Sequence, residues 1–390
     1  MTQQYPPQQQ YPPPWGQPQG WPAPQGQPNV GWNRSQQAFG QVAWPQQPGG
    51  FQQPGGFQQQ PWGYQQPAGY PQPGQFNQAP RPRSPLSRIV VLLVVLCGLL
   101  LAGVVVANAL GGGSSNTTPT PQDTWSPPPP DLNPPDLPSP TTYSEATEWL
   151  QKNKVYSQNT TIPTACPNLQ PIDATSASES ELTAHLQELT SCLVRVWKEP
   201  LEAAGFELPR PPATVYSQTI QTACGKFDDL ENAVYCGADQ RIYYGKALPD
   251  VFPANLRSTT FLMEMVLAHE FGHAIQYRTG IGIASAAWEQ RQSTQAAANV
   301  FSRRLEMQAD CFAGMWVHAV AESQGLSSGD LNGLSQIAYT IGDDVLSGKT
   351  NIDSGHGLGA TRQKWFETGL TGTGRIGQCN TYTVPAGQVR

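Results

Sequence analysis

The chain has 390 residues, of which 39 are proline and 38 are glycine, and only 13% are charged. These averages combine segments of very different composition, so each segment has to be interpreted separately. All 28 acidic residues and all but four of the 22 basic residues lie beyond residue 110, so this part carries a net charge of −10, which argues against nucleic acid or anionic lipid headgroups as ligands.

The N-terminal segment has the composition of a disordered tail. The first 80 residues contain no Asp, Glu or Lys and a single charged residue, Arg34. They are Gln, Pro and Gly interleaved with aromatic residues, without the period of a helix or a strand. Such a segment buries too little apolar area to offset its ordering entropy, so we predict a disordered Gln/Pro/Gly-rich cytoplasmic tail over residues 1–85. Its aromatic side chains could contact a protein partner, or the tail could be a solvated spacer.

The next segment is long and apolar enough to span a membrane. Residues 89–107 are nineteen consecutive residues without a charged or strongly polar side chain, about 29 Å as a helix. Arg81, Arg83 and Arg88 flank the N-terminal end only, so the positive-inside rule places the tail in the cytoplasm. We therefore predict a transmembrane signal anchor over residues 86–110, in a single-pass protein of the cell membrane whose remainder lies outside the cytoplasm. A cleaved signal peptide is the alternative, but the long preceding segment argues against it.

A Pro-rich linker over residues 111–142 separates the predicted anchor from the C-terminal domain, residues 143–390. Pro-rich linkers are semi-rigid at about 3.1 Å per residue. The linker could therefore hold the domain up to roughly 90 Å from the bilayer.

Six of the seven cysteines lie beyond the predicted anchor. An even number in an exported domain is typical of a disulfide framework, for which 15 pairings are possible, and buried reduced thiols are the alternative. No two are spaced as C-x-x-C, which disfavours a zinc ribbon. The six are Cys166, Cys192, Cys224, Cys236, Cys311 and Cys379.

Hydrophobic periodicity in the C-terminal domain predicts one helix, then a β region, then two long helices. Apolar residues recur every three or four positions in the helical patterns, and the β segments are short, rich in Val, Ile and Tyr, and bounded by Gly, Asp or Pro. This order predicts an α+β domain. The helical patterns cover residues 179–197, 259–277 and about 296–322, and the β segments are 214–217, 233–236 and 241–244.

The second helical pattern contains an H-E-x-x-H motif over residues 269–273. Residues i and i+4 share one helix face, so His269 and His273 can bind one tetrahedral Zn²⁺. Glu270 stands beside the first ligand, where it can take a proton from a water activated by the metal. Gly272 is tolerable inside this helix if another backbone packs close to it. A solvated pair of histidines is the alternative, but the surrounding apolar residues favour burial.

The third helical pattern supplies Glu306 and Asp310 on one face. A third ligand from a second helix is what a catalytic zinc site needs, because three protein ligands leave the fourth position for water. Asp310 makes better sense as the acceptor that fixes the tautomer of a ligand histidine. The alternative is a solvated helix face on which the two acids pair with Arg303 and Arg304.

The remaining histidines are less informative. His185 and His318 have the sequence context of ordinary histidines. His356 lies in a Gly-rich loop over residues 354–359. It is either a loop residue or a catalytic donor that stabilises the transition state.

These motifs, with several short runs elsewhere, resemble the bacterial neutral zinc metallopeptidase family over about residues 145–385. The resemblance implies a zincin-like fold, with a small β-sheet and two metal-bearing helices, and hydrolysis of peptide bonds. It favours His269, His273 and Glu306 as ligands of zinc, with Glu270 as the base. The other runs that carry it are Ala223-Cys224-Gly225, Tyr235-Cys236, residues 239–244, residues 305–314, residues 341–344, His356-Gly357, Gln363, Trp365-Phe366 and residues 378–381.

We therefore expect a zinc endopeptidase that acts outside the cytoplasm on a peptide or protein substrate, with residues 241–244 as an edge strand on which the substrate could lie. The rival hypothesis is a catalytically silent, membrane-anchored cell-envelope scaffold whose function is carried by the tail. Retention of the base together with every proposed ligand argues against that rival.

For the cysteines we expect three disulfides. Cys224–Cys236 would close a short β segment, and Cys311–Cys379 would tie the second metal-bearing helix to the C-terminal loop. Cys166–Cys192 is the remaining pair. Loops of this size typically contribute about 2–4 kcal/mol when closed.

Overall fold

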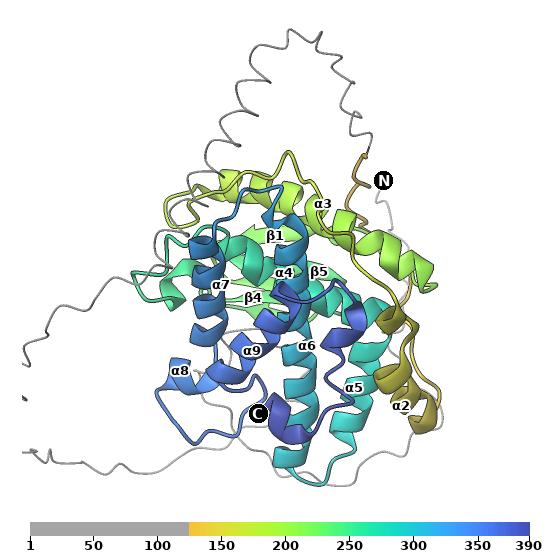
Figure 1. Ribbon diagram of the computed structural model, residues 1–390. Coiled ribbons are helices and arrows are strands. Elements are labelled where there is room, and N and C mark those ends of the chain that lie inside the picture. The colour runs from red at the N-terminus through yellow and green to blue at the C-terminus, as the bar shows by residue number, and fades with distance from the viewer. Residues whose placement is uncertain (1–124) are drawn as a thin grey trace, which may run out of the picture. The chain divides into compact units, whose positions relative to one another are not determined.

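The computed structural model describes residues 125–390, which are mostly helical with a small sheet (Figure 1). The α+β class is as predicted, and the three helical patterns correspond to α3, α4 and α6. The C-terminal stretch, which the sequence marks only by its glycines, contains three further helices. The α-helices are α2 (Tyr143–Lys152), α3 (Glu179–Ala203), α4 (Leu262–Arg278), α5 (Ile281–Gln290), α6 (Gln295–Ala321), α7 (Ser328–Thr340), α8 (Asp343–Ser347) and α9 (Gly359–Leu370).

The main sheet has three strands in the order β1–β5–β4. β5 (Arg241–Gly245) pairs in parallel with β1 (Ala213–Tyr216) and antiparallel with β4 (Ala233–Cys236). The expectation of an edge strand at residues 241–244 is therefore wrong, because β5 is the central strand and β4 lies at the edge. A separate hairpin, β2 (Ile220–Thr222) and β3 (Gly225–Phe227), was not predicted.

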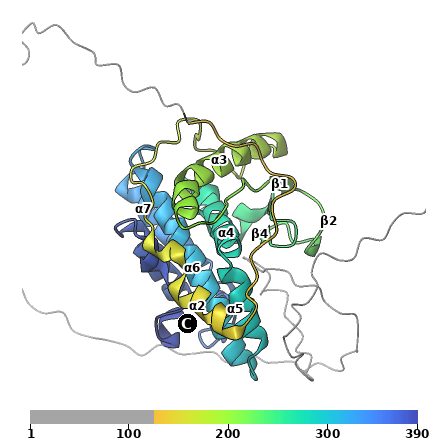
Figure 2. The same ribbon diagram turned by 90° about the vertical axis from the view of Figure 1, so that its right-hand side faces the viewer.

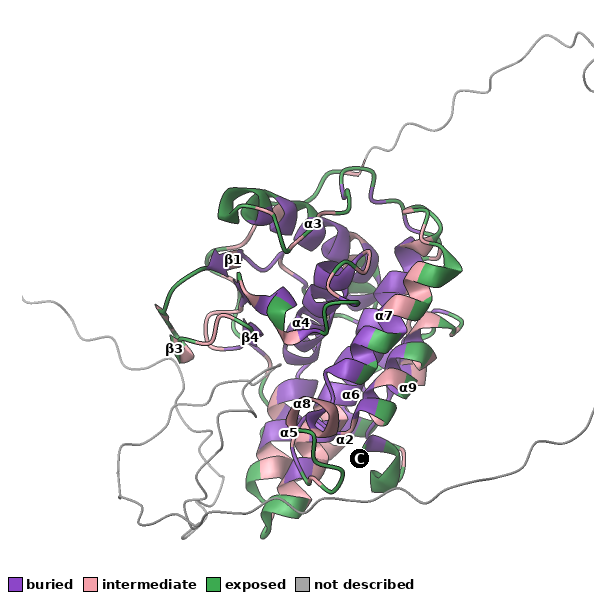
Figure 3. Cartoon of the chain, turned by 90° about the vertical axis from the view of Figure 1, so that its left-hand side faces the viewer, coloured by how far each residue is buried: buried purple, intermediate pink, exposed green. Residues whose placement is uncertain are grey.

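Helix α4 runs through the interior. Every one of its 17 residues is buried, and the helix contacts α6 as well as β4 and β5 (Figure 3). A helix that is largely apolar on all sides is typical of such a position. The functional side chains of α4 are therefore held by packing around the whole helix.

Glycines let three helices approach closely. A Cβ at Gly272 of α4 would lie 3.1 Å from Cα of Ala309 on α6, which is the close backbone that the sequence required of this position. A Cβ at Gly314 of α6 would overlap the carbonyl oxygen of Phe366 on α9, and one at Gly369 of α9 would overlap that of Cys311. These contacts fix α6 against α4 on one side and against α9 on the other.

The three predicted disulfides are all present. Cys166–Cys192 joins the segment before α3 to that helix, and Cys224–Cys236 joins the β2–β3 hairpin to β4. Cys311–Cys379 ties α6 to the C-terminal segment, with a Cα–Cα distance of 5.6 Å.

The chain just before α2 lies against the domain, along the side that bears β4 (Figure 2). The Arg210 guanidinium donates to the Pro128 carbonyl, and Arg278 and Gln240 both donate to the Pro135 carbonyl. The end of the predicted linker therefore makes contacts with the folded part.

The predicted tail (1–85) and anchor (86–110) lie outside the described residues and remain predictions. Within residues 125–390, no helix combines the length and the apolarity that crossing a membrane requires.

Candidate metal centre

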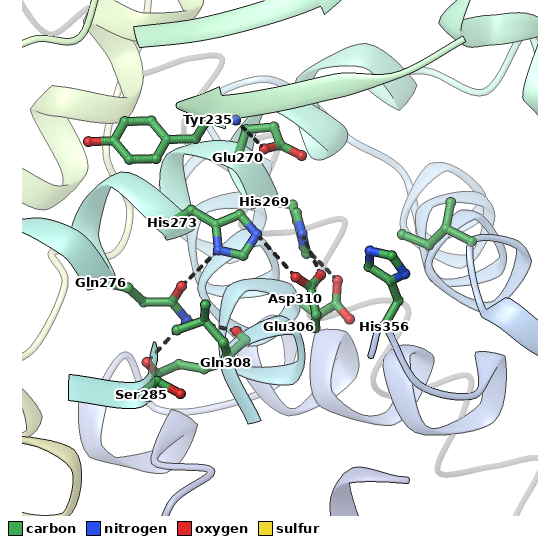
Figure 4. A network of polar contacts seen from close by, with 12 residues as sticks. Tyr235, His269, Glu270, His273, Gln276, Ser285, Glu306, Gln308, Asp310 and His356 are labelled. Atoms are coloured by element: carbon green, nitrogen blue, oxygen red, sulfur yellow. Dashed lines mark hydrogen bonds and ion pairs between the residues drawn. The ribbon is translucent and has the colours of Figure 1, made fainter. Parts of the chain in front are cut away.

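Two helices bring together the residues that the sequence singled out (Figure 4). α4 contributes His269, Glu270 and His273, and α6 contributes Glu306 and Asp310. All five side chains are buried, and Glu306, the most exposed of them, is only 4% exposed. The alternative of solvated helix faces is therefore wrong.

The two arginines proposed as partners for the α6 acids bind elsewhere. Arg303 pairs with Asp353 over 2.6 Å. Arg304 donates to the backbone carbonyls of Thr381 and Val384.

Three atoms of this group converge as metal ligands would. The Nε2 atom of His269 is 3.3 Å from Oε2 of Glu306, and Nε2 of His273 is 3.6 Å from Oε1. Two atoms bound to one tetrahedral Zn²⁺ at 2.0–2.1 Å are roughly 3.3 Å apart. Both Nε2 atoms and Glu306 Oε2 are buried without a hydrogen bond of normal geometry, which is costly unless an ion binds there. The residues therefore fit a metal ion held by two histidines and one carboxylate.

The Glu270 carboxylate lies between the metal-binding group and the sheet (Figure 4). The backbone N–H of Tyr235, on the edge strand β4, donates to Glu270 Oε2 over 2.7 Å. The other oxygen, Oε1, is buried and has no hydrogen-bond partner. Burial raises the pKa of Glu270 to about 7. A carboxylate of this pKa is suited to accept and return a proton near neutral pH.

His269 is oriented by a charged partner. Its Nδ1 lies 2.8 Å from Asp310 Oδ1, which is the role that the sequence predicted for Asp310. Burial alone would lower the pKa of His269, but the Asp310 carboxylate raises it to about 10. Arg362 on α9 binds both oxygens of Asp310, each over 2.9 Å. Burial would raise the pKa of Asp310, but Arg362 and His269 hold it below its usual range.

His273 is oriented by neutral partners instead. Its Nδ1 lies 2.8 Å from Gln276 Oε1, and the Gln276 amide donates to the Leu305 carbonyl and to Gln308 Oε1. Gln308 in turn donates to the Tyr156 hydroxyl. Burial lowers the pKa of His273 to about 4, so this ring is neutral at pH 7.

His356 is buried, although its Gly-rich surroundings suggested a mobile loop. Its backbone N–H donates to Asp343 Oδ2 over 3.1 Å, and its ring Nδ1 lies 3.3 Å from Oδ1. Burial would lower the pKa of His356, but Asp343 raises it, with a smaller contribution from Glu306. His356 therefore stands near the metal-binding group on the Glu306 side, as Figure 4 shows, without belonging to it.

Two other histidines lie apart from this group. His185 on α3 pairs with Glu264 over 2.7 Å, and His318 lies further along α6.

Sequence reasoning missed three groups of the site. Gln276 had a signal, since residues three apart on a helix are neighbours and its amide can face His273. Tyr235 acts through its backbone, which no residue pattern reveals. Arg362 is separated from the motif by about ninety residues and has no pattern of its own.

Comparison with known proteins points to zinc as the metal of the family. The profile of the family described as "Putative neutral zinc metallopeptidase" matches residues 151–382. The chain is 32% identical over 213 residues to the "Uncharacterized protein YpfJ" of Escherichia coli (strain K12), covering 53% of this chain and 74% of that protein. It is 32% identical over 205 residues to the "Uncharacterized protein Rv2575" of Mycobacterium tuberculosis, covering 48% of this chain and 66% of that protein. No solved structure matches the chain significantly.

The matched range contains both helices of the candidate centre and all of the proposed ligands. The chain therefore belongs to this family of zinc metallopeptidases.

Proposed function

We propose that this chain is a zinc-dependent endopeptidase with a zincin-like arrangement of its two central helices, acting on peptides or proteins outside the cytoplasm. The observation that carries the proposal is the pairing of two features in one buried site. Three unpaired ligand atoms of His269, His273 and Glu306 converge, and the free Oε1 of Glu270 lies on the neighbouring residue.

In this proposal His269, His273 and Glu306 hold the ion, and Glu270 moves the proton. Zinc, when bound, supplies a Lewis acid that polarises the scissile carbonyl and lowers the pKa of water. Glu270 Oε1 accepts a proton from the attacking water and passes it to the leaving amine, while Tyr235 N–H keeps Oε2 in place. His356 would donate to the oxyanion from the Glu306 side, with Asp343 orienting its ring.

The proposed location rests on the sequence and on the disulfides. Residues 89–107 would form a single membrane anchor, with the Gln/Pro-rich tail in the cytoplasm as a contact for a protein partner. The three disulfides of the folded part fit an oxidising compartment.

The proposal is tested with the full chain, purified in detergent and loaded with zinc. Cleavage of casein should be abolished by a chelator and restored by added zinc. A zinc-loaded protein that cleaves neither casein nor a mixed peptide library would contradict the proposal and favour the silent scaffold.

A further inference from the structure

Arg362 on α9 lies close to the candidate metal centre, and neither the H-E-x-x-H motif nor the proposed chemistry uses it. Its side chain is completely buried. Its Nε donates to Asp310 Oδ2 and its Nη2 to Asp310 Oδ1, so the two side chains form a two-pronged ion pair. Nη2 also lies 3.5 Å from His269 Nδ1 and 3.8 Å from Glu306 Oε2. The guanidinium therefore reaches two of the three proposed ligands.

The position of Arg362 is fixed by backbone contact between helices. Arg362, Phe366 and Gly369 are spaced by four and three residues, so they share one face of α9. On that face, Gly314 of α6 packs against the Phe366 carbonyl, and Gly369 packs against α6 in return. α9 cannot slide along α6 without overlap at these glycines. The packing of α9 against α6 therefore fixes the position of the guanidinium beside Asp310.

A buried guanidinium is costly unless it is paired, and here its partner is equally buried. Asp310 Oδ1 is shared, because it accepts from Arg362 Nη2 over 2.9 Å and lies 2.8 Å from His269 Nδ1. A chain of contacts thus leads from α9 through Asp310 to the ring whose Nε2 faces the metal position. An ion pair that served only to join α6 and α9 would not require a carboxylate that also contacts His269, a proposed metal ligand.

We propose that Arg362 is a positioning residue of the metal centre. It acts through Asp310, whose carboxylate it holds in the one orientation that points His269 Nε2 at the metal. This inference rests on the proposed zinc site and extends it to a third helix. Two effects oppose each other when the arginine is removed. Loss of a nearby positive charge would favour a dication, whereas loss of orientation disfavours it; changes to groups that orient metal ligands typically cost 10–100-fold in affinity. We expect the loss of orientation to dominate.

The test measures zinc affinity by competition with a chromophoric chelator, without any substrate. Arg362→Gln and Arg362→Lys should both weaken zinc binding by about 10-fold or more. Lysine keeps the charge but cannot form two parallel bonds to one carboxylate, so the charge alone should not rescue binding. In Co²⁺-loaded protein, both variants should shift the visible absorption bands, which report the geometry of the ligands.

A double-mutant cycle tests whether Arg362 acts through Asp310. Asp310→Asn should weaken zinc binding, and adding Arg362→Gln to it should change the affinity by less than about 3-fold, because the shared route is already broken. The double variant leaves neither partner of the ion pair as an uncompensated buried charge. If Arg362→Gln alone does not fold, the zinc affinity of the double variant can still be compared with that of Asp310→Asn.

Arg210→Gln is the matched control. Arg210 is also a buried guanidinium, but it bonds to Thr190 and to the backbone carbonyls of Pro128 and Gln187, away from the centre. This variant should lower the melting temperature and leave zinc affinity unchanged.

Unchanged or tighter zinc binding in Arg362→Gln and Arg362→Lys, with unshifted cobalt bands, would overturn the inference. So would independent, additive losses in the double variant. Because the readout is metal binding, a protein that binds zinc and cleaves no peptide would contradict the proposed function alone.

Discussion

The backbone N–H of Tyr235 donates to Glu270 Oε2 over 2.7 Å and leaves Glu270 Oε1 as the free oxygen. Edge strand β4 thus determines which of the two oxygens of the proposed base is available for proton transfer. The bond also ties the proposed base on α4 to the sheet. In the proposed mechanism, strand β4 and helix α4 therefore both contribute to proton transfer.

Gln276 should matter for metal binding although it touches no metal position. Gln276→Met keeps the length of the side chain but removes the acceptor for His273 Nδ1. We expect zinc affinity to fall by about 10–100-fold, as is typical when a group that orients a ligand is lost. Gln324→Met is the control, since that amide bonds to the Cys166 carbonyl far from the centre and should leave affinity unchanged. Equal zinc affinity in the two variants would show that the amide chain does not orient His273.

Glu306 and Asp310 should differ in what their loss removes. Glu306→Ala removes both carboxylate oxygens, of which Oε2 lies 3.3 Å from His269 Nε2 and Oε1 lies 3.6 Å from His273 Nε2. Zinc occupancy should therefore fall to a small fraction. Asp310→Asn should retain zinc under saturating conditions, with affinity or rate reduced about 10–100-fold. Metal content by atomic spectroscopy after dialysis separates the two. Normal zinc content in Glu306→Ala would assign the third ligand to Asp310 instead.

Zinc binding near neutral pH should release close to one proton. In the metal-free protein the pKa of His269 is raised to about 10, chiefly by Asp310 acting against burial, whereas burial lowers the pKa of His273 to about 4. Above pH 7 Glu270 has already lost most of its proton, so of the two histidine ligands and the base only His269 carries a proton that zinc must displace. The affinity should therefore fall about tenfold for each unit that the pH is lowered in this window. Calorimetry in buffers of different ionisation enthalpy counts the protons, and release of two would contradict the account.

The sequence predicts those parts of the site whose residues lie within a turn or two of the same helix. His269, Glu270 and His273 follow from one helical turn, and Glu306 with Asp310 follow from another, so residue spacing is sufficient. These predictions need only the period of a helix and the order of the elements.

The remaining groups depend on long-range packing. β5 pairs in parallel with β1, so the strand expected at the edge is central, and the edge role passes to β4. Arg362 reaches Asp310 only because two glycines bring α9 against α6. Neither relationship has a local period, so residue patterns could not reveal it.

The proposed membrane topology can be tested separately. Protease added to intact cells that express the full chain should remove the C-terminal domain and spare the N-terminal tail, because arginines flank only the N-terminal end of residues 89–107. Tags at the two ends report the fragments, and lysed cells provide the control in which both ends are accessible. A C-terminal domain that is degraded only after lysis would refute this topology.

The most direct measurement of the central claim compares zinc content and peptide cleavage in the Glu270→Gln protein. The amide keeps the size of the side chain, and its oxygen can still accept from Tyr235 N–H, but it cannot take a proton from water at neutral pH. His269, His273 and Glu306 are untouched, so zinc content should equal that of the unmodified chain. The cleavage rate should fall by at least about 10²–10⁴-fold, the usual contribution of a general base. Equal zinc content with an undiminished cleavage rate would contradict the role of Glu270 and the proposed mechanism with it.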